Sequence, residues 1–431
     1  MRRQAKLAEW MARPWFFTLW CVIAAFGAYA SMYGFRKPFT AGSYGGAEGK
    51  AWLVTAQVLG YMLSKIVGIK VIAEMTAERR ARAFLILIAI AEAALLLFAV
   101  TPTPFNAGWL FVNGLSLGMV FGLVLGFVEG RCLTELFVAG LCASFIVADG
   151  FTKSIGSLLL QSGLSERWMP CVAGLFFVLP LLVFVWMLEQ IPAATAQDEA
   201  ARSPRTPMTG AERLAMIRRH GVGLFGLMFA YLLITVLRSI RGDFAAEVWA
   251  SLGLGNQPAI FTQSELWVTL AVVLTNGALV LVEDNRRAFF GGLGLSATGL
   301  GVALLALAGY RDGFLPPFAF MVLLGVGMYV PYIAVHTTLF ERLIALTRER
   351  GNIGYLMYLA DALGYLGYVG VMLAHGAISS KEDFLAYFLR LATGLLGAAL
   401  VALLGACAFY YWRNNDWGVS GDEGTSQTSV P

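Results

Sequence analysis

Long apolar runs separated by short polar connections recur along the whole chain. Each run has about 18 or more residues, enough for a helix to cross the hydrocarbon core of a bilayer. We predict twelve membrane-spanning helices, at 15–38, 51–73, 83–101, 108–130, 138–160, 169–190, 221–247, 260–282, 288–309, 316–340, 353–375 and 384–412. The pattern therefore predicts an all-α polytopic membrane protein whose surroundings are a lipid bilayer.

One long polar connection, 191–220, divides the predicted helices into two groups of six. It begins with a mix of Ala, Pro and Ser that is typical of a linker. It ends with Thr209 and Glu212, which have the spacing of a capping box at the start of a helix. We therefore predict an N-terminal half over 1–190, a cytoplasmic linker over 191–220, a C-terminal half over 221–412 and a disordered tail over 413–431.

The first helices of the two halves are alike. In each, a tyrosine precedes an arginine by seven residues, as Tyr29 precedes Arg36 and Tyr231 precedes Arg238. Seven residues are two helical turns, so the members of each pair lie on one face. Two related six-helix halves predict a substrate site at their interface, near the middle of the membrane.

Composition and charge narrow the class of protein. Hydrophobic residues make up 58% of the 431 residues, and the net charge of +4 gives no support for nucleic-acid binding. Most of the 31 lysines and arginines fall on one predicted side of the membrane, and the loops of the other side hold only Lys50, Arg167, Arg311 and Lys381. By the positive-inside rule both termini are cytoplasmic, and we expect a protein of a bacterial inner (plasma) membrane.

No motif in the sequence predicts an enzyme, a metal site or a cofactor. A nucleophile elbow and a P-loop are both missing from it. The five cysteines have no paired spacing. The three histidines, His220, His336 and His375, are far apart in the chain, and we interpret them as packing or surface residues.

Ionisable residues inside the predicted spans are the main functional signal, because each is costly in lipid unless it has a partner. Some have a partner nearby on their own helix. Asp149 and Lys153 are four residues apart and can neutralise each other. Arg241 can join Asp243 or Glu247 in an ion network near the outer end of the seventh helix.

Three cations, Arg36, Lys65 and Arg238, have no acid three or four residues away on their own helix. Their counter-charge has to come from another helix or from a ligand. Converging from three helices, they would bind an anion with more than one charge, and the N–H fork of arginine suits phosphate. Lys37 follows Arg36 directly, faces about 100° away on a helix, and is expected to turn toward the outer interface.

Tyrosines and acids complete the predicted site. Tyr33, Tyr61 and Tyr358 are candidate hydroxyl donors to the anion. Asp361, Asp149 and Glu265 are candidate proton carriers if transport is coupled to protons, with Asp361 as first choice, because a buried carboxylic acid can hold a proton near neutral pH.

The segment YGFRKPF (33–39) resembles the helix 1 motif Tyr-x-x-Arg-Lys-x-Phe of the organophosphate:phosphate antiporters of the major facilitator superfamily. YMLSK (61–65) resembles the Tyr-x-x-Ser-Lys of their helix 2, and VLR (236–238) resembles their helix 7 segment with a second arginine. The resemblance implies that Arg36 and Arg238 bind phosphate beside Tyr61 and Lys65. It also implies the major facilitator fold of twelve helices in two pseudo-symmetric six-helix halves.

The chain departs from this family at helix 5, where KSIG places Lys153 instead of the histidine of a His-Asn-Val-Gly sequence. Lys153 is still a cation, and we expect it to contact the anion in place of that histidine. We therefore interpret the chain as a divergent relative. We expect a secondary active transporter of a small organic anion, a phosphorylated one as first choice, working by alternating access with exchange for another anion such as phosphate. A proton-coupled transporter of another small solute, with an intramembrane aspartate as carrier, and a non-transporting membrane sensor stay open as alternatives.

Overall fold

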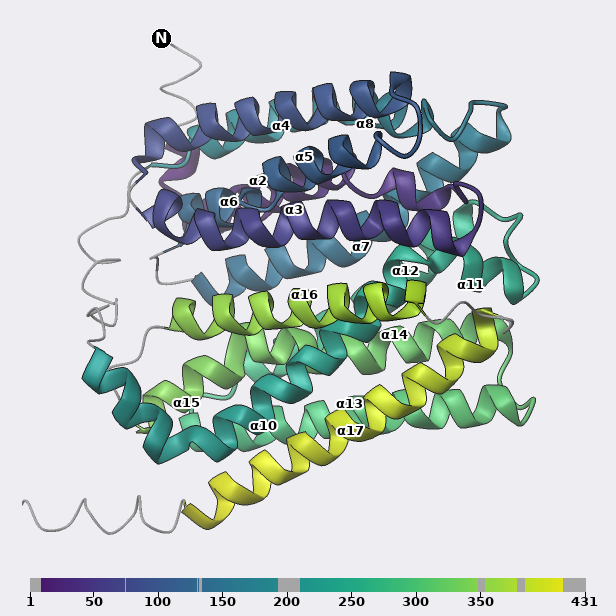
Figure 1. Cartoon of the computed structure of the whole chain (residues 1–431). Helices are drawn as coiled ribbons and strands as arrows, with labels where there is room; N and C mark the ends of the chain where they lie inside the picture. Colours follow the sequence, from purple (N-terminus) through teal and green to yellow (C-terminus); the bar gives the residue numbers. More distant parts are fainter. Residues whose placement is uncertain are drawn as a thin grey trace, which may run out of the picture.

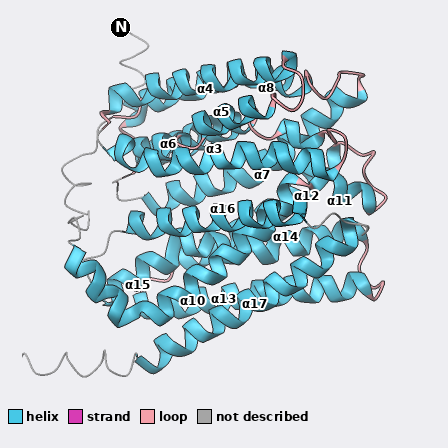
Figure 2. Ribbon diagram, viewed as in Figure 1, coloured by secondary structure: helices cyan, strands magenta, loops and turns pink. Residues whose placement is uncertain are grey.

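The computed structural model of the protein describes residues 9–73, 75–129, 131, 134–192, 210–347, 353–377 and 384–413. All regular elements in these residues are helices, joined by short loops (Figure 2). The long helices lie side by side and run back and forth between the two ends of one bundle (Figure 1). The prediction of an all-α chain is thereby confirmed for the described residues.

The first half of the chain supplies α2 (Pro14–Tyr33), the 3₁₀ turn η1 (Pro38–Ala41), α3 (Ala47–Ala73), α4 (Ala77–Val100), α5 (Ala107–Leu117), α6 (Val120–Val128), α7 (Thr134–Gln161) and α8 (Met169–Glu189). The second half supplies α10 (Gly210–Asp243), α11 (Ala245–Ser251), α12 (Ala259–Val280), α13 (Asn285–Arg311), α14 (Pro317–Ala334), the π turn η2 (Val335–Leu339), α15 (Phe340–Thr347), α16 (Ile353–Ala377) and α17 (Phe384–Arg413).

The first membrane helix ends earlier than predicted. α2 stops at Tyr33, and the chain continues through a turn into η1, which begins at Pro38. The amide N–H groups of residues 34–36 donate to the carbonyl three residues earlier, as in a tightened turn, and Pro38 has no N–H with which to continue the helical hydrogen bonds. As a result Arg36 and Lys37 lie in this turn rather than in a regular helix.

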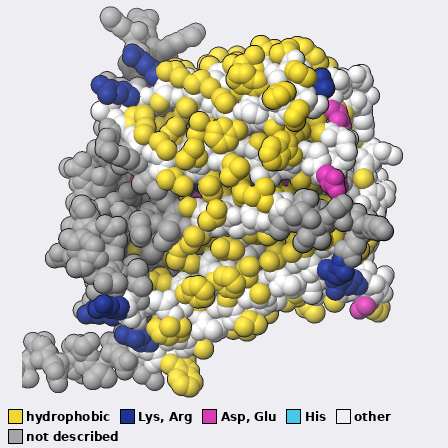
Figure 3. All heavy atoms as spheres, viewed as in Figure 1, with side chains coloured by type: hydrophobic (Ala, Val, Ile, Leu, Met, Phe, Trp, Pro, Cys, Tyr) yellow, Lys and Arg dark blue, Asp and Glu magenta, His cyan; other side chains and the backbone are white. Residues whose placement is uncertain are grey.

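Ten helices among the described residues are long and apolar enough to cross a membrane. The other two predicted spans, 260–282 and 353–375, coincide with α12 and α16. Apolar side chains cover the side of the bundle seen in Figure 3, and charged side chains gather at its two ends. Leu179, Leu305 and Val401 are more than 70% exposed, which water disfavours and lipid permits. The chain is an integral membrane protein with multiple spans.

We call the end of the bundle that carries η1 and α11 the α11 end, and the opposite end, which carries α15, the α15 end; these lie at the right and left of Figure 1. The start of α2, the start of α10 and the end of α17 lie at the α15 end. That the α15 end is cytoplasmic stays a prediction, as does the division into halves at 191–220. Residues 193–209 of the predicted linker and 414–431 of the predicted tail lie outside the described residues.

The two halves meet along four helices. α7 packs against α12, and α3 packs against α16. α3 and α7 are the second and fifth long helices of the first half, and α12 and α16 hold the same places in the second half. The pairing is therefore crosswise, as a two-fold relation between similar halves requires. The inner faces of these helices, with the ends of α2 and α10, surround the space between the halves.

α3, which carries two residues of the predicted site, is held close against α5. A Cβ atom added at Gly114 would lie 1.9 Å from the carbonyl oxygen of Gln57, and one added at Gly60 would lie 2.0 Å from that of Phe111. Glycine is required at both positions, because no side chain fits where two backbones approach this closely. The contact fixes the depth and rotation of α3 within its half.

Replacing Gly114 by alanine is expected to destabilise the protein by about 1–3 kcal/mol, because the added methyl group meets backbone that cannot turn aside. Gly108→Ala is the matched control, since it lies in the same helix and its added Cβ has nothing within 4 Å. Thermal unfolding of the purified proteins in detergent measures the difference. Equal unfolding midpoints for the two variants would contradict the close approach of α3 and α5.

Candidate functional site

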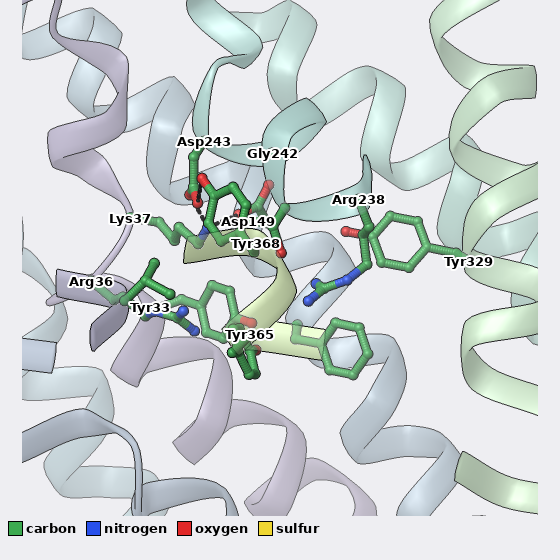
Figure 4. A pocket seen from close by; sticks show the side chains of 13 residues that line it. Tyr33, Arg36, Lys37, Asp149, Arg238, Gly242, Asp243, Tyr329, Tyr365 and Tyr368 are labelled. Atoms are coloured by element: carbon green, nitrogen blue, oxygen red, sulfur yellow. Dashed lines mark hydrogen bonds and ion pairs between the residues drawn. The ribbon is translucent and has the colours of Figure 1, made fainter. Parts of the chain in front are cut away.

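A narrow cavity lies between the two halves (Figure 4). Its lining comes from both halves: Tyr33, Arg36, Lys37, Val58, Phe145 and Asp149 from the first, and Arg238, Ser239, Gly242, Asp243, Tyr329, Tyr365 and Tyr368 from the second. Its free volume of about 10 Å³ has room for roughly one water molecule. A larger ligand would require the halves to move apart.

Polar side chains occur around this cavity in three layers. On α10, Tyr231, Arg238 and Asp243 follow one another at intervals of about 10 and 8 Å along the helix axis, and each belongs to a different layer. The middle layer, which we call the arginine layer, consists of Arg36, Arg238, Tyr33, Tyr61, Tyr329, Tyr332 and Tyr365. The layer toward the α11 end, the lysine–aspartate cluster, consists of Lys37, Asp149, Lys153, Asp243 and Tyr368. The layer toward the α15 end, the His336 cluster, consists of Lys65, Tyr231, His336 and Asp361.

The two arginines of the arginine layer enter the cavity from opposite halves and stack on tyrosine rings. The guanidinium carbon of Arg36 lies 3.7 Å from the ring centroid of Tyr61, and that of Arg238 lies 4.4 Å from the ring centroid of Tyr332. Figure 4 shows both guanidinium groups directed toward the space beside Tyr365. Stacking covers one face of each group and leaves its N–H fork free for a ligand.

Neither arginine forms an ion pair in the part of the chain that the structure describes. No described carboxylate pairs with Arg36 or Arg238, and the Nε of each makes no hydrogen bond. Arg36 is only 5% exposed, so its charge is taken out of water without a partner, which is costly. The structure thus brings together two of the sequence-predicted cations, on opposite sides of one cavity.

The prediction that Lys37 turns toward the outer interface is wrong. Its Nζ forms an ion pair with Asp243 of the other half and lies 3.4 Å from a carboxylate oxygen of Asp149. The prediction assumed the rotation of a regular helix, but α2 has already ended at Tyr33. In the turn that follows, Lys37 reaches the cavity and joins the two halves.

The predicted pair of Asp149 and Lys153 is present. Lys153 also donates to the carbonyl oxygen of Gly242 at 2.5 Å, and Tyr368 donates to Asp243 at 2.9 Å. Two lysines and two aspartates make the lysine–aspartate cluster neutral as a whole. Lys153 lies behind Asp149 and does not line the cavity, so its expected contact with the anion stays a prediction.

The ion network predicted for Arg241 has different members. Arg241 pairs with Glu265 of α12 at 2.8 Å, rather than with Asp243 or Glu247. Glu247 pairs instead with Lys50 at 2.7 Å. Lys50, expected in an outer loop, lies in the first turn of α3 and is fully buried. Arg241 and Glu247 are close along the chain, but the partner of each lies on another helix.

Lys65 and Asp361 form an ion pair between the halves. Asp361 also accepts a hydrogen bond from the hydroxyl of Tyr231, whose oxygen lies 2.7 Å from Nε2 of His336. Lys65 therefore has its counter-charge from α16, and Asp361 is not an isolated acid. His336, interpreted from the sequence as a packing or surface residue, belongs to this buried polar cluster, and no local signal in the sequence marks it.

The tyrosines of the site differ in part from those predicted. Tyr33 lines the cavity and Tyr61 supports Arg36, but the side chain of Tyr358 lies outside what the structure describes. Sequence reasoning missed Tyr329 and Tyr332 on α14. It also missed Tyr365 and Tyr368 on α16, although these follow Asp361 by four and seven residues on one helix face. That spacing is the signal that could have found them.

No cluster of three or more histidine, cysteine or carboxylate side chains suitable for a metal ion occurs among the described residues. The side chains described around the cavity include arginine, lysine, tyrosine, aspartate and a histidine. Such an arrangement can bind an anion and hold a proton.

Comparison of the sequence with protein families finds one match. The family is described as "Family of unknown function (DUF5690)", and its profile matches residues 38–414. The match covers most of the chain, so the chain belongs to this family. Comparison with curated proteins finds no match.

Solved structures identify the fold as that of the major facilitator superfamily. A D-xylose–proton symporter superposes with a TM-score of 0.61 at 15% identity, covering 92% of this chain and 97% of its own. The nucleoside transporter NupG gives 0.61 at 14%, covering 91% and 98%. The human organic anion transporter MFSD10 (TETRAN) gives 0.55 at 18%, covering 91% and 100%. At these identities the likeness shows the fold alone, and the likeness to organophosphate:phosphate antiporters stays an expectation.

Proposed function

We propose that this member of a family of unknown function, built on the major facilitator fold, is a secondary transporter of a small organic anion. The observation that carries the proposal is the pair of arginines, Arg36 and Arg238, that face one cavity from opposite halves and form no ion pair with a carboxylate among the described residues. The other described cations near the cavity each pair with a carboxylate: Lys37, Lys50, Lys65, Lys153 and Arg241. The region thus has an excess of two positive charges.

A phosphate monoester matches this excess best. Each guanidinium presents a planar fork of N–H groups that can bind two oxygens at once, and a phosphate dianion has oxygens for both forks. Tyr33 and Tyr365 line the same space and can donate their hydroxyls. An uncharged sugar or nucleoside would leave both arginine charges buried without a partner, which is unfavourable.

Alternating access follows from the placement of the arginines on opposite halves. Without an anion, two like charges face each other across the cavity and oppose its closure. A bound dianion attracts both, so closure around the anion is favoured over closure of the empty site. If the empty site closes rarely, transport proceeds as exchange of one anion for another, such as an organic phosphate for inorganic phosphate.

The ion pairs of the two aspartates weigh against the alternative in which either aspartate alone carries a proton. Asp149 pairs with Lys153, and Asp361 pairs with Lys65. A proton on either carboxylate would leave the charge of its lysine buried without a partner.

Counterflow in proteoliposomes tests the proposed function. Vesicles that hold the purified protein and unlabelled phosphate, or a simple phosphate monoester, should transiently accumulate the labelled compound from outside without any imposed gradient of other ions. Arg238→Lys is expected to reduce this accumulation strongly. Arg311→Lys, a change of an exposed arginine at the α11 end, should leave it at the wild-type level. Binding without counterflow would indicate a sensor, and the lack of both would refute the anion site.

A further inference from the structure

The His336 cluster lies beside the arginine layer on its α15 side, and the proposed exchange of anions makes no use of it. We propose that His336 binds a proton that accompanies the anion, and that the bound proton and the bound anion stabilise each other. This inference rests on the proposed anion site and deepens it, because it identifies the coupled ion and the residue that holds it.

The hydrogen bonds of the cluster indicate which nitrogen of His336 takes the proton. Tyr231 has a single hydroxyl proton, which it donates to Asp361, so its oxygen is left to accept. Nε2 of His336 lies 2.7 Å from that oxygen and therefore carries the hydrogen when the ring is neutral. Nδ1 makes no hydrogen bond in the part of the chain described. A proton can bind Nδ1 without breaking an existing contact.

The charges around His336 make the proton sensitive to the anion. Asp361, 3.6 Å away, is already neutralised by Lys65, so a proton on His336 adds a full positive charge. Among the described residues, the ionisable side chains that contact His336 or act on its charge are Asp361 of α16, Lys65 of α3, Tyr231 and Arg238 of α10 and Tyr332 of α14; Tyr365 of α16 lies near Tyr332, and Cys142 of α7 lies near Asp361. α15 and the start of α13 carry Glu341, Arg342, Arg286 and Arg287, and both segments lie at the α15 end of the bundle (Figure 1).

One aromatic ring connects the proposed proton to the proposed anion. The ring of Tyr332 lies 4.9 Å from the ring of His336, and the guanidinium of Arg238 stacks on the same tyrosine at 4.4 Å. In the empty site the charge of Arg238 opposes protonation of His336. An anion bound to Arg238 removes this opposition, and by linkage a proton on His336 strengthens anion binding by the same factor.

The backbone at His336 is an independent indication of a functional position. His336 lies in η2, a π-helical turn of five residues inserted between α14 and α15, and α14 contains Pro331 just before it. A π turn adds a residue to the helix and redirects its side chains, and such turns are frequent at functional sites. The turn directs His336 toward Tyr231 and Asp361.

The proposed cycle therefore moves one proton with each dianion. The proton binds Nδ1 as the anion binds the arginines, and both leave together on the other side of the membrane. A difference in pH across the membrane would then drive the anion toward the alkaline side, because protons flow in that direction.

Calorimetry of anion binding to the purified protein tests the inference, with sulfate as the probe because it stays a dianion from about pH 5.5 to about pH 8. Wild-type affinity should be on the order of tenfold higher at the lower pH. His336→Gln, which cannot gain a charge, should bind at both pH values as the wild type binds at the higher one. His220→Gln is the matched control, since His220 stacks on Tyr410 away from the cavity, and it should keep the wild-type response.

Two outcomes would overturn the inference and leave the anion site intact: wild-type affinity that does not depend on pH, or a dependence that persists in His336→Gln. Failure of the wild type to bind either sulfate or inorganic phosphate would instead refute the proposed function, and the inference with it. If His336→Gln does not fold, histidine NMR of the wild type gives the answer, since the chain has only three histidines. Saturating sulfate should raise the titration midpoint of His336 by about one pH unit; an unmoved midpoint would overturn the inference.

Discussion

Replacing Arg36 by lysine should weaken the binding of a phosphate-bearing anion by about ten- to a hundredfold, and transport should fall with it. Lysine keeps the charge but loses the N–H fork and the flat face that stacks on Tyr61. A charge-assisted hydrogen bond contributes roughly 1.5–3 kcal/mol, which corresponds to this factor. Arg238→Lys should behave alike, because Arg238 faces the same cavity and stacks on Tyr332 in the same manner.

Affinity for phosphate, measured on purified and monodisperse protein, distinguishes a binding role from a structural one. Arg241→Lys is a suitable control, because Arg241 is also buried but its charge is matched by Glu265. Its affinity for phosphate should stay close to that of the wild type. Wild-type affinity in folded Arg36→Lys protein would refute the anion site.

Replacing Lys37 by glutamine should destabilise the protein by about 3–5 kcal/mol, the usual cost of removing one partner from a buried ion pair. Lys37 pairs with Asp243 and lies beside Asp149, so its loss removes the ion-pair partner of Asp243 and leaves Lys153 as the one ion-pair partner of Asp149 among the described residues. The sequence alone predicts a mild effect, since it places Lys37 at the outer interface. The structure reverses that expectation.

Thermal unfolding in detergent measures the effect of Lys37→Gln. Arg167→Gln, which removes a cation from an exposed position, is the control and should be nearly neutral. The double variant Lys37→Gln with Asp243→Asn should cost less than the sum of its single variants, because it removes both partners together. An unfolding midpoint for Lys37→Gln equal to that of Arg167→Gln would contradict the buried pair.

The fold was largely predictable because a bilayer allows few solutions. Backbone groups in lipid must be hydrogen-bonded within the chain, so apolar runs of this length form helices. Ten of the twelve predicted spans meet the requirements of a membrane helix, and the other two coincide with α12 and α16. The exact end of α2 at Tyr33 was not predictable from hydropathy, since apolar residues continue beyond it, as Phe35, Pro38 and Phe39 on either side of Arg36 and Lys37.

The sequence by itself determined the membrane environment, the approximate places of the long helices, and the two arginines without a local acid, Arg36 and Arg238. These features depend on residues within one or two helical turns of each other, which a sequence displays directly. Only the tertiary structure decided which cations are already neutralised and which are free to meet a ligand. Lys37 and Asp243 are 206 residues apart in the chain, and Lys65 and Asp361 are 296 apart. Counter-charges and the neighbours of His336 come from helices that meet only when the halves pack, so no local pattern contains them.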